Sequence, residues 1–231
     1  MKFFKKKLLT EKCFYDKIYL VKEVLKMKYI KWKTLFITSL ICLLPILFGA
    51  FIWDSLPEKM AVHFDLYNNP DNFFPKGFAV FGLSFLMMVF NFISCIAYDI
   101  SIYKYGEKNK SERVVKWIIP VLTVVLQGVT FGYNLGYNID IKMLASIVVG
   151  VVFLITGNYV FKLDYVKNYN TTKEKAKKIN RFMGAGTVIM GILFIISAFL
   201  PPNAMKVCLF LFILYGVLNA VFATIIQKKS Q

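Results

Sequence analysis

The chain has 231 residues, of which 58% are hydrophobic and 18% charged, and its formal net charge is +16. In soluble domains about half of the residues are apolar and about a quarter are charged, so this composition excludes a water-soluble globule. It also excludes a disordered chain, because disorder combines charge with low hydrophobicity. The remaining class is an integral membrane protein with an excess of basic residues.

Six apolar stretches are long enough to cross a bilayer as α-helices, which takes about 20 residues each. They lie at about 34–53, 77–98, 117–138, 143–161, 182–200 and 205–227, and none holds an ionisable side chain in its interior. The strands of an outer-membrane barrel are shorter and alternate in polarity. The pattern therefore predicts an all-α integral membrane protein, a bundle of six transmembrane helices over residues 34–227.

The basic residues are divided unevenly among the connections. Of the 29 Lys and Arg residues, 25 lie in residues 1–33, in the connections 99–116 and 162–181, and in the tail 228–231. The alternate connections hold only Lys59, Lys76, Lys142 and Lys206. Because cytoplasmic connections collect Lys and Arg, we expect both termini in the cytoplasm and the loop 54–76 outside. The charge then reports orientation, and no nucleic-acid partner is expected.

The basic segment 1–33 precedes the first span and lacks the compact apolar core of a signal peptide. Phe14, Ile18, Val21 and Leu25 fall on one face of a helix. This pattern predicts an amphipathic helix on the inner leaflet. Two alternatives stay open, namely a tail without regular structure and an extension ahead of a start near Met27.

Few residues offer chemistry. The four cysteines are far apart in sequence, and the single histidine, His63, lies in a loop. We therefore expect no catalytic site, no cofactor and no resident metal. Ion-coupled transporters keep ionisable groups inside the bilayer, and the six predicted spans hold none. Neutral polar residues do occur in the spans and suit either interhelical hydrogen bonds or a polar ligand path: Asn91, Gln127, Asn134, Asn138, Asn158 and Asn219.

Gly132 and Gly136 form a Gly-x-x-x-Gly pattern near the end of the third span. Such spacing is typical of helices that pack closely in membranes, although it is common in apolar segments.

The loop 54–76 reverses the basic charge of the chain, with four acidic residues against two lysines. Val62, Phe64 and Leu66 alternate with His63 and Asp65, which indicates a short extended segment. Asn69-Pro70-Asp71 then predicts a turn. On a strand His63 and Asp65 would point the same way, so they suit a metal site, a pH sensor or a structural histidine bond.

Two signatures carry a resemblance to a known family. The first combines Leu56-Pro57, Val62-His63-Phe64, Pro70-Asp71 and Lys76, and the second combines residues 136–141 with Gly157-Asn158-Tyr159. Together they resemble the SdpI-like proteins, small bacterial multi-pass membrane proteins named for an immunity protein against a secreted toxic peptide. The resemblance covers the chain from about residue 30 onwards.

The resemblance implies an immunity or receptor protein of the bacterial cytoplasmic membrane. Such a protein binds or neutralises a membrane-active peptide at the outer face, and some relatives hold a transcriptional repressor, here at residues 162–181. The acidic residues of the loop would attract a cationic peptide, and its phenylalanines would add apolar contact. The candidate binding residues are Asp54, Leu56, Pro57, Glu58, His63, Phe64, Asp65, Asp71, Phe73, Phe74, Asp140 and Asn158.

Two alternatives accompany this expectation. The basic connections are also explained by topology and by contact with anionic lipid. Six spans with three in each half would suit a small-solute permease, or an accessory subunit of a transport complex, built on an inverted repeat. No self-similarity between the halves supports such a repeat.

Overall fold

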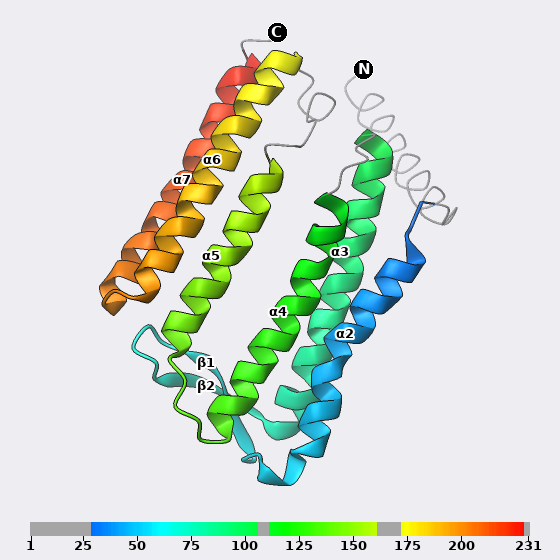
Figure 1. The fold of residues 1–231 in the computed structure, drawn as a ribbon, viewed down its shortest axis with the longest axis vertical. Coiled ribbons are helices and arrows are strands. Elements are labelled where there is room, and N and C mark those ends of the chain that lie inside the picture. Colours follow the sequence, from blue (N-terminus) through cyan, green and yellow to red (C-terminus); the bar gives the residue numbers. More distant parts are fainter. Residues whose placement is uncertain (1–28, 106–110, 161–171, 229–231) are drawn as a thin grey trace, which may run out of the picture.

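The computed structural model describes residues 29–105, 111–160 and 172–228 (Figure 1). The predicted amphipathic helix before the first span falls almost wholly outside these ranges. So does the first half of the connection 162–181.

Six long helices dominate the described part of the chain, and each contains a stretch long and apolar enough to cross a membrane. The prediction of six spanning helices is confirmed. Three of the helices lie within three residues of the predicted spans, two are displaced by four to seven residues, and α6 begins nine residues before the predicted start at 182. The helices are α2 (Trp32–Phe51), α3 (Leu83–Tyr105), α4 (Ser111–Asn134), α5 (Ile141–Val160), α6 (Lys173–Ala198) and α7 (Pro202–Lys228).

The helices form two groups of three (Figure 1). Helices α2, α3 and α4 pack against one another, and α5 packs most extensively against α6, which also contacts α7. The two groups approach each other where α4 ends and α5 begins. They diverge toward the opposite end, where α2 begins and α7 finishes (Figure 1).

A β-hairpin connects α2 to α3 at the end where the groups meet (Figure 1). A short 3₁₀ turn, η1 (Trp53–Ser55), leads into β1 (Lys59–Phe64), which pairs antiparallel with β2 (Pro70–Pro75). A π-helical turn, η2 (Phe78–Gly82), then leads into α3. Met60 pairs with Phe74 and Ala61 with Phe73, whereas the register shifts on both sides of His63.

The turn of the hairpin lies earlier than the sequence predicted. Pro70 and Asp71 already belong to β2, and the reversal occurs over Asp65–Asn69. The Asp65 carboxylate accepts from the backbone N–H groups of Tyr67 and Asn69, both at 2.8 Å. Asn68 takes a positive φ of 66°, which asparagine tolerates better than most residues. Asp65 therefore starts the turn, a role that the sequence analysis had given to Asn69.

The core of the first group lies under the hairpin. Leu56 and Met60 from the hairpin side pack with Ala79 and Val80 of η2 and with Phe131 of α4. A smaller cluster of Met190, Phe194 and Cys208 joins α6 to α7. Cys42, Cys95 and Cys208 are buried and free.

Glycines bring α5 and α6 into close backbone contact. A Cβ atom at Gly150 would lie 2.7 Å from the carbonyl oxygen of Gly191, and one at Gly157 would lie 3.0 Å from that of Gly184. Any larger side chain at these positions would push the two helices apart. Small residues at such crossings are typical of helices that associate within membranes.

The close helix packing that the spacing of Gly132 and Gly136 could allow does not occur at either glycine, and a Cβ at Gly132 would meet only the side chain of Ile139 in the following connection. Gly136 has a positive φ of 90°, and a Cβ there would meet no atom within 4 Å. The N–H of Tyr137 donates to the Gly132 carbonyl at 3.1 Å, and that of Gly136 donates to Tyr133 at 3.0 Å. This pair of bonds is a Schellman motif, so the two glycines end α4.

Candidate functional site

Lys76 fixes the end of β2 to η1 and to the segment between η1 and β1. Its side chain is buried, and Nζ donates to the carbonyl oxygens of Leu56 at 3.2 Å and Trp53 at 3.4 Å. The same ammonium pairs with Glu58 at 2.8 Å and lies 4.9 Å from the centroid of the Trp53 ring. A buried ammonium needs such partners because desolvation of an unpaired charge is costly. Lys76 therefore shapes the loop from within.

Asn134 fixes the hairpin to α4. Its side chain accepts from the N–H of Ala61 at 2.8 Å and donates to the carbonyl of Ala61 at 2.9 Å. This amide thus occupies the edge of β1 that faces away from β2. Next to it, the rings of Phe64 and Tyr133 meet edge to face at 4.5 Å. The first strand is therefore held on both sides.

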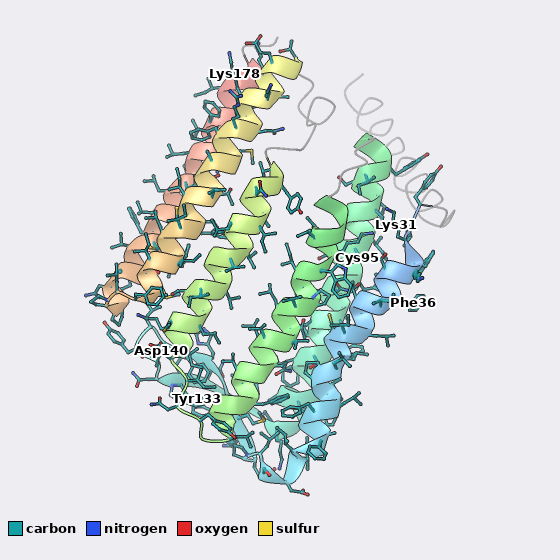
Figure 2. All side chains as sticks on the ribbon, in the orientation of Figure 1. Lys31, Phe36, Cys95, Tyr133, Asp140 and Lys178 are labelled. Carbon is teal, nitrogen blue, oxygen red and sulfur yellow. The ribbon has the colours of Figure 1, made fainter. Side chains whose placement is uncertain are left out.

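The tip of the hairpin reaches the second group of helices. Asn68 accepts from the N–H of Lys142 at 2.7 Å and donates to Asp140 at 3.0 Å. Asp140 lies at the start of α5 (Figure 2) and caps it, accepting from the N–H of Met143 at 2.8 Å. Asn68 thereby binds the tip of the hairpin to the first turn of α5.

Helix α7 also contacts the tip. Lys206 donates to the hydroxyl of Tyr67 at 3.3 Å, and its ammonium lies 5.3 Å from the centroid of that ring. The hairpin is consequently bonded to both groups of helices.

Two carboxylates at the tip are held in their charged form by hydrogen bonds. The N–H of Asn69 is the main cause that lowers the pKa of Asp65, and the N–H of Met143 is the main cause that lowers the pKa of Asp140. Hydrogen bonds to a carboxylate favour its ionised form. The carboxylate of Asp65 is bonded within the turn, and that of Asp140 is bonded at the start of α5. Few of their lone pairs are therefore left to bind a ligand.

The outward surface of the hairpin carries a paired histidine. His63 Nδ1 lies 2.5 Å from Asp71 Oδ1, and their side chains are 69% and 47% exposed. The expectation that His63 and Asp65 lie on one strand and point the same way is wrong, because Asp65 lies beyond the end of β1 and is bonded within the turn. No three His, Cys, Asp or Glu side chains come together as a metal site among the described residues.

The predicted binding residues fall into three sets. Leu56 is buried in the core and Phe74 packs edge-on against Phe78 at 4.9 Å; with Phe64, Asp65 and Asp140 they support the hairpin. Asn158 lies near the far end of α5, away from the hairpin. The third set is solvent-exposed and comprises Asp54 of η1, Pro57 and Glu58 just before β1, and His63, Asp71 and Phe73 of the hairpin.

The first group of helices contains an ion pair that the sequence analysis missed. Lys116 Nζ lies 2.5 Å from Asp99 Oδ1, and both side chains are at most 2% exposed. The other oxygen of Asp99 accepts from the N–H of Lys31 at 3.1 Å. Both residues lie in helices that hold candidate membrane spans, and these candidate spans extend beyond the predicted ones. The predicted spans stopped one residue short of Asp99 and began one residue after Lys116.

Neutral polar residues of the same group bond between helices, as one of the two interpretations predicted. Asn91 donates to Thr38 at 3.0 Å and to Ser39 at 3.2 Å. Gln127 donates to Ser84 at 3.0 Å and to the carbonyl of Ala79 at 3.1 Å. These bonds link α2, α3 and α4 through their interior.

Comparison with known proteins gives one match. The family described as "Domain of unknown function (DUF1648)" matches residues 40–88, about a fifth of the chain. The matched segment runs from the middle of α2 through the hairpin into the start of α3. No curated protein and no solved structure matches the chain. The similarity to a known family thus coincides with the hairpin and its two flanking helices.

Proposed function

We propose that the protein is a membrane receptor or immunity protein that binds a membrane-active peptide at the hairpin. The resemblance of the outer loop to SdpI-like proteins suggested this role, and one structural observation carries it. The hairpin is bonded to both groups of helices through Asn134 and Asn68 and still leaves His63, Asp71 and Phe73 exposed. A connection that only joined α2 to α3 would need no hydrogen bonds to α4 or to α5.

The exposed hairpin surface matches a peptide that is both cationic and partly apolar. Asp54 and Glu58 are exposed acids beside the base, and Asp71 lies on the second strand. Phe73 is 50% exposed and Tyr67 is 56% exposed. Aromatic side chains supply large contact area, and opposite charge speeds association.

A peptide bound at the tip would also act on the packing of the helices. Asn68 contacts α5 and Tyr67 contacts α7, so a displaced tip changes how the second group meets the first. In this proposal the basic first turns of α6, within Lys173–Arg181, dock a repressor in the cytoplasm. The ends of the helices that lie opposite the hairpin (Figure 1) would transmit the binding event to that surface.

A host killing assay tests the proposal. Cells with and without the protein are exposed to a series of synthetic Lys- and Leu-rich amphipathic peptides, and the lethal concentration is measured. We expect expression to raise it, and the combined variant Asp54→Asn, Glu58→Gln, Asp71→Asn to remove most of the protection. Lys59→Gln is the matched control, because it removes a positive charge from an exposed residue of the same hairpin. Absence of protection, or equal protection by the triple variant, refutes the proposal.

Transport is the second candidate function, favoured by the buried pair of Asp99 and Lys116. Ionisable residues within membrane spans commonly mark ion or substrate pathways. Reconstituted vesicles loaded with a pH-sensitive dye would report proton-linked uptake of amino acids or sugars. If uptake occurs and is lost in the double variant Asp99→Asn, Lys116→Met, the permease replaces the receptor.

A further inference from the structure

An apolar groove of about 440 Å³ separates the two groups of helices. One wall is α4 from Val114 to Val125, and the other is α5 from Ile147 to Ile155. Its lining side chains are aliphatic except for Trp117, whose indole ring carries one N–H donor. The groove lies where α4 and α5 diverge, away from the hairpin (Figure 1).

Water is a poor occupant of this groove. A water molecule in an interior site needs two to four polar partners, and the indole N–H of Trp117 is the single polar side-chain group among the lining residues. Direct closure of the groove would require α4 and α5 to meet, but the hairpin contacts hold the groups together at the other end only. In a bilayer the available filling is hydrocarbon. We propose that the groove binds an acyl chain of an anionic phospholipid.

Trp117 indicates the level at which a lipid headgroup would lie. Trp117 lies on the α4 wall of the groove, near the start of α4, and is 40% exposed. Tryptophan is enriched at the boundary between hydrocarbon and headgroups. A lipid whose headgroup lies at this level would extend its chain along the groove toward the hairpin.

Charge at the same end of the molecule favours an anionic headgroup. Lys177 and Arg181 are exposed and four residues apart, so they share a face of α6. Since Gly157 faces Gly184, Arg181 lies a little more than one helical turn beyond the level of Ile155. The neighbouring Lys178, near the start of α6 at the top of Figure 2, is partly neutralised by Glu174 at 3.2 Å.

Fluorescence quenching by brominated lipids tests this site in the full chain. Trp32→Phe and Trp53→Phe leave Trp117 as the single tryptophan, because the chain has three. The protein is reconstituted in phosphatidylcholine vesicles that contain brominated phosphatidylglycerol or brominated phosphatidylcholine. We expect half-maximal quenching of Trp117 at an about 5-fold lower mole fraction of brominated phosphatidylglycerol than of brominated phosphatidylcholine. A basic residue near the headgroup contributes about 1 kcal/mol, which corresponds to this factor.

Variants distinguish binding of the acyl chain in the groove from binding of the lipid headgroup at α6. Val121→Phe fills the groove and should reduce quenching of Trp117 by both lipids. Lys177→Gln with Arg181→Gln should remove the preference for the anionic lipid, whereas Lys59→Gln, at the hairpin, should leave it unchanged. A control reporter is Phe210→Trp on α7 in a chain without the other tryptophans. This residue is 66% exposed, and we expect both lipids to quench the new tryptophan equally.

Each other result overturns the proposal. Equal quenching of Trp117 by the two lipids, unchanged by Val121→Phe, would mean ordinary contact with bulk lipid. No quenching by either lipid would mean that protein covers the groove, whether a bound peptide or a segment of this chain. A preference that survives Lys177→Gln with Arg181→Gln would place the headgroup contact elsewhere.

Discussion

The two groups of helices solve the same packing problem in different ways. Helices in a membrane gain little by hiding apolar surface from lipid, so they associate through polar bonds or close backbone contact. The first group uses polar bonds, with Asp99, Asn91 and Gln127 buried between α2, α3 and α4. The second group uses glycines between α5 and α6. The first solution fixes specific partners, whereas the second depends on shape.

The largest expected effect comes from breaking the ion pair of the first group. Lys116→Met should destabilise the protein by about 3–5 kcal/mol, because the carboxylate of Asp99 would stay buried without its cation. Unfolding in mixed detergent, followed by helical circular dichroism, measures this loss. The double variant Asp99→Asn, Lys116→Met should recover much of it, because a neutral amide can still accept from Lys31. A double variant as unstable as the single one would show that the pair acts by more than charge balance.

The stability of the second group should depend on side-chain size at the glycine contacts and not on charge. Gly157→Leu should cost about 1–3 kcal/mol, because the added atoms would overpack the contact with Gly184. Gly216→Leu on α7 is the matched control, since a Cβ there would meet nothing within 4 Å. The same unfolding measurement applies. Similar losses in the two variants would argue against close packing as the cause.

A smaller effect is expected from the neutral bonds of the first group. Asn91→Leu should destabilise by about 1 kcal/mol, the size of an interhelical hydrogen bond in a membrane. Asn158→Leu on α5 should change stability little, because Asn158 is exposed. If both variants behave alike, the polar bonds of the first group do not distinguish it from the second.

The smallest expected effect is local and depends on pH. Asp65 has a pKa lowered below its ordinary value of 3.8, so its support of the turn is present above that value. This support is lost as the pH falls through the folded-state pKa. Hydrogen exchange of the Tyr67 and Asn69 amides, corrected for intrinsic rates, should therefore accelerate in strong acid. Asp65→Asn should show fast exchange already at neutral pH, and a pH response equal to that of the native chain would contradict this account.

The spanning helices could be predicted because length and hydropathy are local properties. The hairpin could be predicted only in part. Alternation from Val62 to Leu66 indicated an extended segment, but β2 reads Pro-Asp-Asn-Phe-Phe-Pro and has no such alternation. Proline at each end is compatible with an edge strand, yet only pairing with β1 makes the segment a strand.

The ion pair and the glycine contacts depend on tertiary structure. A charged residue ends an apolar run, so Asp99 and Lys116 were assigned to a connection although each neutralises the other inside the bundle. The glycines did leave a signal, because Gly150 and Gly157 have the same seven-residue spacing as Gly184 and Gly191. That signal required two helices to be compared, whereas the single-helix pattern of Gly132 and Gly136 marked a helix end.

The hairpin lies within the first half of the sequence but joins both halves of the fold. Asn68 completes the start of α5, so the covalent link between α4 and α5 is not the sole connection between the groups at this end. A chain divided after Gly136 and produced as two fragments should therefore reassemble in the membrane, detectable by co-purification. Deletion of the tip should abolish this fragment complementation. The hairpin thus ties the two groups of helices together independently of the continuity of the chain between α4 and α5.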